Sequence, residues 1–464
     1  MQNHIDARIA KSALAKFLRE TTVPGTEVHS LIIRQNNQEL LRWQIAPYTC
    51  DDKRELYSLS KSFTSTAMGV AYDRGLVRPE DLVLDLFPEY RELGRQDERW
   101  ARMQLRHVMT MSTGHAACVF PQMAFSEDSV RAFFETPLAW EPGEMFIYNT
   151  GATCLMAEVV RRVTGLTVPQ LLSQTLFDAL GIEGAEWKVC SDGHCQGGTG
   201  LALSCDDLAK FGQLYLDRGV WNGRRVLSEA WCDLATSFQM NNERNGNPDW
   251  TNGYGFQFWR NRHKGYRGDG AFGQLCVVIP EKQLVLALVQ ETDDMHKQFE
   301  LLWPWLDKLC EAADEAQEPL SAYEAPSSPI RPGYDSGWRT MEKNGAGLHA
   351  LRLCTDDAGV KLHWSDDLSL QTIRAPWHGW QTNSLHASGL MPNLHDMMPR
   401  TVRQELRFSA AAFTDGERIC LDVRMRNAPH HFVMAFEEKA GRLHMQLESI
   451  HDVFAQEKQI CEKA

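Results

Sequence analysis

Residues 54–76 read RELYSLSKSFTSTAMGVAYDRGL, and this stretch carries the strongest structural signal in the chain. Between Ser60 and Asp73 the apolar residues recur at helical spacing, and Gly75 follows as a typical helix stop. One apolar face comprises Phe63, Ala67, Val70 and Ala71. The stretch therefore predicts a helix that begins close to Ser58.

Ser58 and Lys61 stand three residues apart at the start of this helix, so their side chains share one face. A hydroxyl is a weak nucleophile. It needs a neighbour that accepts its proton and N–H donors that hold the oxyanion. The free N–H groups of a helix start and a lysine one turn away supply both. Taken alone the pattern is common, and most such pairs are a helix cap and a solvated charge.

A second motif lies in residues 141–151, EPGEMFIYNTG, which precede another predicted helix. A tyrosine at a loop-to-helix junction, such as Tyr148, can point its phenol inward. Beside a buried ammonium its pKa would fall, so it would serve as a general base. The alternative is a tyrosine at the edge of the core with a hydrogen-bonded hydroxyl.

A third motif, YRGDGAFGQ at residues 266–274, enters a predicted strand. Glycines at the start of a strand allow close approach of a ligand, and a strand N–H there would complete an oxyanion hole. The alternative is a bulge or a tight turn.

In this order and at these separations, the three motifs resemble the serine β-lactamase-related superfamily. That superfamily comprises class C β-lactamases, low-molecular-weight penicillin-binding proteins, and esterases and amidases of the same fold. The resemblance runs from about Val28 to Leu309 and includes residues 106–115, 197–227 and 270–289. It implies an α/β fold of the α+β type, in which helices flank an antiparallel sheet.

The resemblance also implies roles for individual residues. Ser58 would be the acyl-forming nucleophile, Lys61 its proton partner, and Tyr148 the base of the Y-x-N motif. The oxyanion would lie between the backbone N–H of Ser58 and one from the strand at Gly268 to Gly270.

The chain departs from the superfamily pattern at two motifs. Thr150 stands where Asn is usual, and in β-lactamases that Asn contacts the substrate's side-chain amide. The third motif, usually K-[ST]-G or H-x-G, reads Arg267-Gly268-Asp269 next to the glycines of the strand. In this register Arg267 would bind a substrate carboxylate, and Asp269 would be its partner or a turn residue. The alternative register, His263-Lys264-Gly265, lies further from the strand glycines.

The remainder of the first 315 residues mixes strands and helices. Residues 27–45 predict two strands around the polar turn Asn36-Asn37. Further helices are expected at Ala152–Val163, Ser204–Arg218 and Gln298–Leu309, and further strands at 251–259, 271–280 and 283–290. The predicted strands come from both ends of these 315 residues, and most of the predicted helices come from the middle. We therefore expect an antiparallel sheet with helices packed on it.

Residues 311–332 differ in composition and contain four prolines, which interrupt any long helix or central strand. We expect a β-lactamase-like serine hydrolase domain at 1–315, a linker at 316–332 and a small antiparallel β domain at 333–464. The last segment holds nine histidines between His349 and His451, including His430-His431. We interpret these as strand histidines with satisfied hydrogen bonds.

Composition limits the partners. The 464 residues contain 48 Lys and Arg against 61 Asp and Glu, a net charge of −13, which argues against general binding to nucleic acid or anionic membranes. No apolar run approaches the ~20 residues of a membrane span. The N-terminal residues predict an amphipathic helix rather than a signal peptide. The 12 scattered cysteines are typical of reduced thiols, so we expect a cytoplasmic protein.

These observations together predict a serine hydrolase that cleaves a small ester or amide without a metal or organic cofactor. Cys190, His194 and Cys195 are expected in a surface loop rather than a zinc site, because a fourth ligand is lacking. Two alternatives remain: a β-lactamase or DD-peptidase, and a catalytically idle scaffold or binding protein of the same fold. The oligomeric state stays open.

Overall fold

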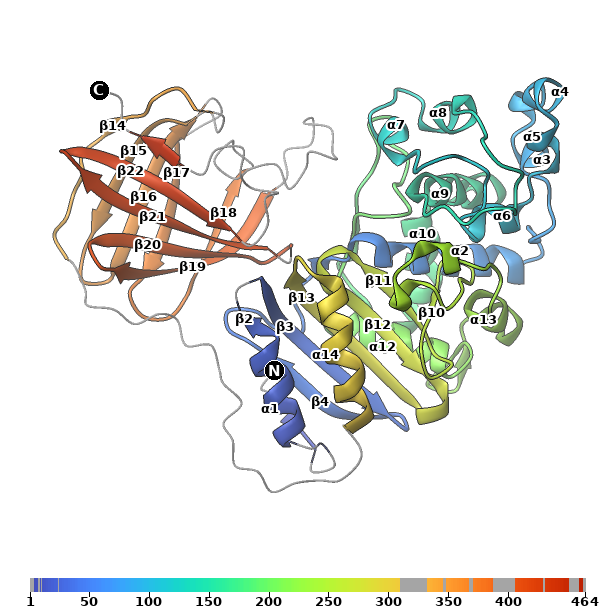
Figure 1. The fold of residues 1–464 in the computed structure, drawn as a ribbon, viewed down its shortest axis with the longest axis horizontal. Coiled ribbons are helices and arrows are strands. Elements are labelled where there is room, and N and C mark those ends of the chain that lie inside the picture. Colours follow the sequence, from blue (N-terminus) through green and yellow to red (C-terminus); the bar gives the residue numbers. More distant parts are fainter. Residues whose placement is uncertain are drawn as a thin grey trace.

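The computed structural model describes residues 4–6, 9, 11–23, 25–308, 332–344, 348–366, 370–386, 405–428, 430–449 and 459–461. Figure 1 shows a larger part of helices on a sheet, followed by a part made of strands. Of the predicted linker, only Pro332 falls within the described residues. No helix in these ranges is long and apolar enough to span a membrane.

The larger part is built on one antiparallel sheet in the order β1-β4-β3-β13-β12-β11-β10, with β2 paired to β3 off this path. Its central pair joins β3 to β13, so strands from both ends of this part of the chain meet, as predicted. The strands are β1 (His4–Ile5), β2 (Thr22–Val23), β3 (Thr26–Gln35), β4 (Gln38–Gln44), β10 (Trp259–Arg260), β11 (Tyr266–Gly270), β12 (Gln274–Ile279) and β13 (Leu284–Thr292).

Local turn chemistry explains one correct and one wrong strand prediction. Asn36 and Asn37 both adopt left-handed φ, 49° and 63°, and form the tight β3–β4 turn. The strand predicted at 251–259 is wrong, because only Trp259 of that range lies in a strand. Gly253 and Gln257 have positive φ, so the chain turns and buries its aromatic residues without extended pairing.

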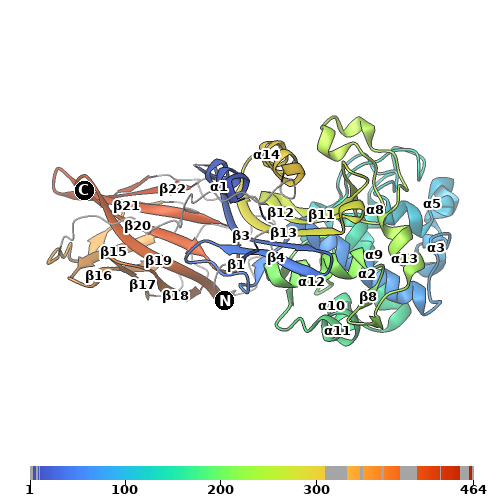
Figure 2. The ribbon, with the colours of Figure 1, turned by 90° about the horizontal axis from the view of Figure 1, so that it is seen from below.

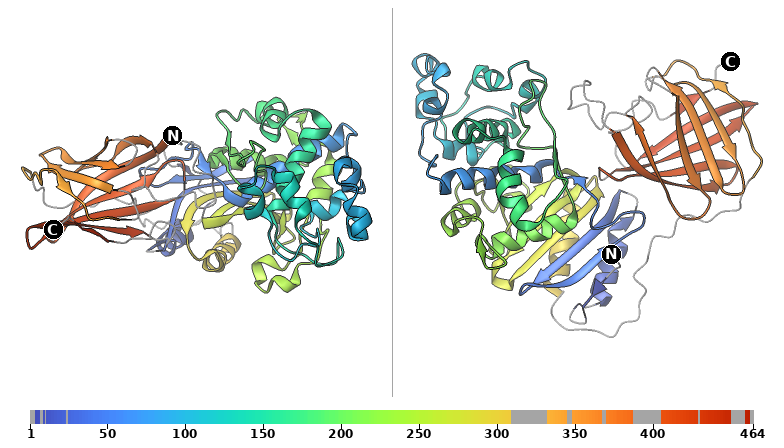
Figure 3. Two further views of the ribbon diagram at one scale, coloured as in Figure 1. Left: turned by 90° about the horizontal axis from the view of Figure 1, so that it is seen from above. Right: turned by 180° about the vertical axis from the view of Figure 1, so that it is seen from behind.

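Helices cover both faces of the sheet (Figure 2). On one face lie α1 (Lys11–Glu20) and α14 (Met295–Lys308), and on the other α2 (Ser60–Asp73), α9 (Thr150–Thr164) and α12 (Cys205–Leu216). Figure 3 shows α12 across the sheet, where it packs against β3, β12 and β13. Further helices are α3 (Val83–Leu86), α4 (Leu93–Gln96), α5 (Glu98–Arg102), α6 (Leu105–Met109), α7 (Phe120–Ala124), α8 (Ser129–Glu135), α10 (Val168–Leu172), α11 (Asp178–Leu180) and α13 (Glu229–Thr236).

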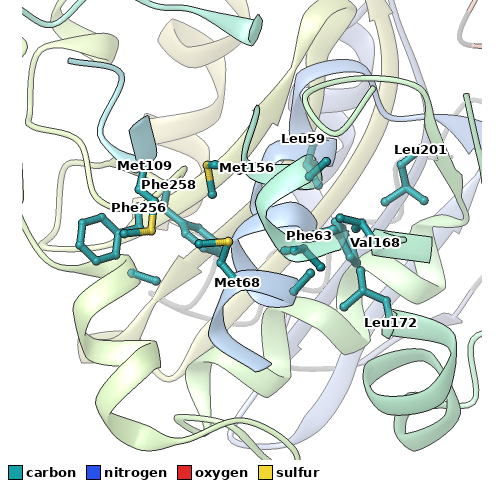
Figure 4. Close-up of a cluster of buried hydrophobic side chains, with 14 of the residues drawn as sticks. Leu59, Phe63, Met68, Met109, Met156, Val168, Leu172, Leu201, Phe256 and Phe258 are labelled. Atoms are coloured by element: carbon teal, nitrogen blue, oxygen red, sulfur yellow. The ribbon is translucent and has the colours of Figure 1, made fainter. Parts of the chain in front are cut away.

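The helix α2 is buried on every side from Ser60 to Ala71. Its apolar residues meet side chains from α9, α10 and the 256–258 segment (Figure 4). Its hydroxyl residues are satisfied inside the core, since Ser62 donates to the carbonyl of Gln257 and Ser65 to that of Phe256. This enclosure fixes the N-terminal end of α2, where Ser58 lies.

The C-terminal part confirms the predicted antiparallel β domain. It contains two sheets, β14-β15-β16-β17 and β18-β19-β20-β21-β22-β23, around one hydrophobic cluster that includes Trp364 and Trp377. The bounds are β14 (Arg339–Thr340), β15 (Leu348–Thr355), β16 (Gly359–Asp366), β17 (Leu370–Pro376), β18 (Gln381–His386), β19 (Glu405–Asp415), β20 (Arg418–Met425), β21 (His431–Lys439), β22 (Arg442–Ser449) and β23 (Gln459–Cys461).

Candidate active site

Ser58 lies in a short 3₁₀ turn, η1 (Tyr57–Leu59), which leads directly into α2. Lys61, one turn further, donates a hydrogen bond from Nζ to Ser58 Oγ at 3.0 Å and another to the carbonyl of Gly198 at 2.7 Å. The lysine is only 2% exposed. The serine and the lysine therefore meet, as their spacing predicted.

Tyr148 reaches the same serine from the loop before α9. Its hydroxyl hydrogen-bonds with the Ser58 side chain. Its ring stacks on Trp259 with centroids 5.4 Å apart, and the Lys61 ammonium lies 4.9 Å from the ring centroid. The structure thus brings Ser58, Lys61 and Tyr148 into one cluster.

The acid–base properties of this cluster correct one expectation. Burial lowers the pKa of Lys61 to about 8, although the nearby Asp269 carboxylate opposes the shift. Burial raises the pKa of Tyr148 well above its ordinary value, and the Asp269 charge adds to that rise. The expectation that the Tyr148 pKa falls is therefore wrong. Removal from water outweighs the neighbouring cations, and Lys61 is the group with an accessible neutral form.

The strand β11 closes against the start of α2. A Cβ added at Gly270 would lie 2.0 Å from the carbonyl oxygen of Leu56, and one added at Gly268 would lie 2.8 Å from Ser62 Oγ. Only glycine permits this approach. Among the described residues, the Ser58 N–H makes no hydrogen bond to a carbonyl outside its own turn. The predicted oxyanion donors, this N–H and the strand from Gly268 to Gly270, are therefore neighbours.

Arg267 lies on the opposite face of β11, which corrects its expected role. It is 0% exposed, and its guanidinium donates to Asp269, to Asn261 and to the carbonyl of Asp249. These bonds engage all three of its nitrogens within the enclosed interior, so Arg267 is held by protein groups and is not presented to a substrate carboxylate. Asp269 is its partner, the first of the two roles considered for it, and also accepts a hydrogen bond from Trp250 Nε1 at 3.0 Å.

The alternative register of the third motif lies elsewhere. His263 and Lys264 have positive φ in the turn between β10 and β11, at the end of β11 away from Gly270. Lys264 pairs with Glu281 at 2.8 Å. The glycines that adjoin α2 are therefore those of the preferred register.

Two residues of the site escaped the sequence analysis. The Gly198 carbonyl binds Lys61, and the glycine run at 197–200 was the available signal of close backbone approach. Asn149 caps α9, and its Oδ1 accepts from the N–H groups of Val119 and Gly151. Thr150, which follows, places its methyl against Gly198: a Cβ added there would lie 2.7 Å from the Thr150 methyl carbon.

Comparison with known proteins agrees with this geometry. The sequence model of the Beta-lactamase family matches residues 11–311. The chain is 25% identical over 230 residues to the 6-aminohexanoate-dimer hydrolase of Paenarthrobacter ureafaciens, covering 46% of this chain and 58% of the relative. It is 25% identical over 179 residues to a β-lactamase of Escherichia coli K12, covering 37% of this chain and 46% of the relative. The aligned segments thus span about half the length of these curated relatives.

Solved structures share the fold. A penicillin-binding protein homologue from Caulobacter crescentus matches with a TM-score of 0.53 at 14% identity, covering 63% of this chain and 93% of that one. The octameric penicillin-binding protein homologue from Pyrococcus abyssi matches with a TM-score of 0.50 at 14% identity, covering 97% of this chain and 99% of that one. The family match extends over more than half of the chain and includes Ser58, Lys61, Tyr148 and β11, so this protein belongs to the Beta-lactamase family.

Proposed function

We propose that this protein hydrolyses a small ester or amide through an acyl-enzyme on Ser58. One observation carries the proposal: Ser58 Oγ lies 3.0 Å from the buried amine of Lys61 and is also hydrogen-bonded to the Tyr148 hydroxyl. Relatives named as a hydrolase and as β-lactamases support the reaction class.

In the first half-reaction, the Ser58 oxygen attacks the substrate carbonyl carbon. The Ser58 proton passes to neutral Lys61, directly or through the Tyr148 hydroxyl, which stays protonated because its pKa is raised. The Ser58 N–H and a donor from Gly268–Gly270 hold the oxyanion. Collapse of the tetrahedral intermediate breaks the bond to the alcohol or amine, which leaves with the transferred proton.

In the second half-reaction, a water attacks the acyl-enzyme and gives its proton to the same lysine–tyrosine pair. The second tetrahedral intermediate then releases the carboxylic acid and returns a proton to Ser58. We expect Thr150 to disfavour β-lactams: its methyl group lies against Gly198, and its one hydroxyl reaches less far than the Asn amide that contacts the substrate's side-chain amide in β-lactamases. Esters and simple amides are therefore preferred to β-lactams.

Steady-state turnover tests this proposal. We expect p-nitrophenyl esters of graded chain length to be hydrolysed by the wild type and, at best, residually by Ser58→Ala. Ser237→Ala, at an exposed serine, is the matched control and keeps full activity. Rapid nitrocefin turnover would favour the β-lactamase alternative. Equal ester turnover by wild type and Ser58→Ala would refute the proposal, and no reaction at Ser58 with any probe would favour the idle-scaffold alternative.

A further inference from the structure

The C-terminal β domain touches the residue that precedes the candidate nucleophile. The connection between β20 and β21 lies at the end of the C-terminal β domain that faces the larger part of the molecule (Figure 1). His430, just before β21, places Nε2 2.7 Å from the Tyr57 hydroxyl. Its ring also meets the edge of Phe272, with centroids 4.6 Å apart and planes at 83°. The His430 side chain is 0% exposed, so this contact lies fully inside the molecule.

The two aromatic residues that His430 contacts, Tyr57 and Phe272, both have a strained backbone. Tyr57 has φ of 47° and Phe272 has φ of 62°, in the left-handed region that bulky side chains rarely adopt. Such conformations persist only where the surroundings hold them. The Tyr57 and Phe272 rings also contact each other, with centroids 5.0 Å apart. His430 therefore contacts two strained residues, Tyr57 and Phe272, which also contact each other.

These two residues flank the candidate oxyanion donors. Tyr57 directly precedes Ser58, so the peptide between them carries the Ser58 N–H. Phe272 lies in the turn that follows Gly270, at the end of β11 that closes on α2. A change at either backbone would move one of the two donors.

The contact is anchored by paired charges, which hold His430 in place. The backbone N–H of His431 donates to the fully buried carboxylate of Glu291 at 3.1 Å. Arg424 pairs with Glu27, and both side chains are less than a tenth exposed. Arg54 donates to the carbonyl of Ala428. The ionic partners come from opposite sides of the interface, so the two parts carry complementary charges where they meet.

We infer that His430 is a positioning residue, through which the C-terminal β domain holds Tyr57 and Phe272 and thereby the oxyanion donors on either side of Ser58. The inference rests on the proposed function. Without His430, the Tyr57 hydroxyl loses a buried partner and the strained turn relaxes. The donors then no longer converge on the oxyanion, while the Lys61–Ser58 pair remains in place.

The test uses the full chain with His430→Ala, His430→Gln and Tyr57→Phe, and p-nitrophenyl butyrate as the substrate. We expect His430→Ala and Tyr57→Phe each to lower kcat about tenfold, the size of one hydrogen bond, with KM changed less than about twofold. The double variant should be no slower than either single variant. His430→Gln, which keeps a hydrogen-bonding side chain, should recover part of kcat.

His363→Ala is the matched control, because His363 bonds only within the C-terminal β domain, to Thr372 among the described residues, and should keep wild-type kcat. Wild-type kcat in both His430→Ala and Tyr57→Phe, or losses that multiply in the double variant, would overturn the inference. If His430→Ala fails to fold, Tyr57→Phe carries the test, since it keeps the ring contact with Phe272. A wild type that is not acylated at Ser58 would overturn the proposed function and, with it, this inference.

Discussion

At the residue scale, the buried amine of Lys61 sets the pH dependence. Burial lowers its pKa to about 8, and only the neutral amine accepts the Ser58 proton. We expect kcat/KM for an ester to rise with pH and level off above about pH 8. Lys61→Arg keeps a charged side chain, so it should lower kcat/KM about 100-fold or more. The exposed control Lys264→Arg should leave kcat/KM unchanged. A flat profile between about pH 6 and pH 9 would contradict this role.

The Tyr148 hydroxyl is expected to relay the proton without titrating. Tyr148→Phe should lower kcat by about 100-fold because the hydrogen bond to Ser58 is lost. The phenylalanine ring still stacks on Trp259, so the Lys61 surroundings persist and the midpoint of the pH profile should stay where it is. The pH profile of kcat/KM, measured on Tyr148→Phe, tests this prediction. A lost or displaced midpoint would make Tyr148 the titrating base instead.

The sequence predicted the meeting of Ser58, Lys61 and Tyr148 because short spacing and recognisable motifs encode it. It did not predict the burial of Arg267, since that depends on distant residues. Strand alternation puts Arg267 and Asp269 on one face of β11, and Trp250 and Phe299 then cover them. The direction of the Tyr148 pKa shift was predicted wrongly for the same reason, because the extent of burial depends on the assembled site.

At the scale of elements, the approach of β11 to α2 depends on glycine. Gly270→Ala would place a Cβ 2.0 Å from the Leu56 carbonyl oxygen, so β11 must shift away from η1. We expect a loss of about 1–3 kcal/mol in the free energy of unfolding, together with a loss of kcat beyond that seen in the control.

Gly165→Ala supplies that control. Gly165 ends α9 with φ of 76° and open space around it, so alanine there strains only the backbone, at about 1 kcal/mol. Urea unfolding and ester turnover are measured on both variants. A Gly270→Ala enzyme with wild-type kcat would contradict the placement of the oxyanion donors.

Elements whose residues carry a regular apolar pattern were predictable from the sequence, and elements whose pattern is interrupted were not. The helix α2 begins and ends where its apolar spacing and Gly75 place it. The strands β17 and β18 lack a clear local pattern, for reasons visible in their residues. In β17 a buried Gln371 interrupts the apolar alternation, and in β18 Leu385 is the only aliphatic residue. Tertiary contacts, rather than local pattern, therefore define these strands.

At the scale of the whole molecule, buried histidines predict acid sensitivity. Burial lowers the pKa of His29 to about 3 and those of His107 and His115 to about 4. The unfolded chain therefore binds protons more readily than the native one between about pH 6.5 and these values. The free energy of unfolding should fall as the pH drops through this window.

His431 acts in the opposite direction at the domain contact. Burial opposes its protonation, but the Glu291 carboxylate prevails and raises its pKa. Its contribution is thus present below about pH 6.5 and lost as the pH rises through the raised pKa. Burial also lowers the pKa of His363. Four histidines with a lowered pKa against one with a raised pKa predict a lower urea midpoint at about pH 5 than at about pH 7.5. An equal or higher midpoint at about pH 5 would contradict this account.

The contact between the two domains could not be predicted from the sequence. The His430–Tyr57 bond joins residues 373 positions apart, and no local pattern links them. The sequence analysis expected His430 to be a strand histidine with satisfied hydrogen bonds. Instead it lies just before β21, and its Nε2 bonds Tyr57 in the other part of the molecule.

The central claim is that Ser58 forms the acyl-enzyme, and rapid-quench intact-protein mass spectrometry with p-nitrophenyl butyrate tests it most directly. The account predicts a single butyryl adduct that maps to the peptide containing Ser58 and is absent from Ser58→Ala. Ester turnover without an adduct, or an adduct on another residue that survives in Ser58→Ala, would contradict it.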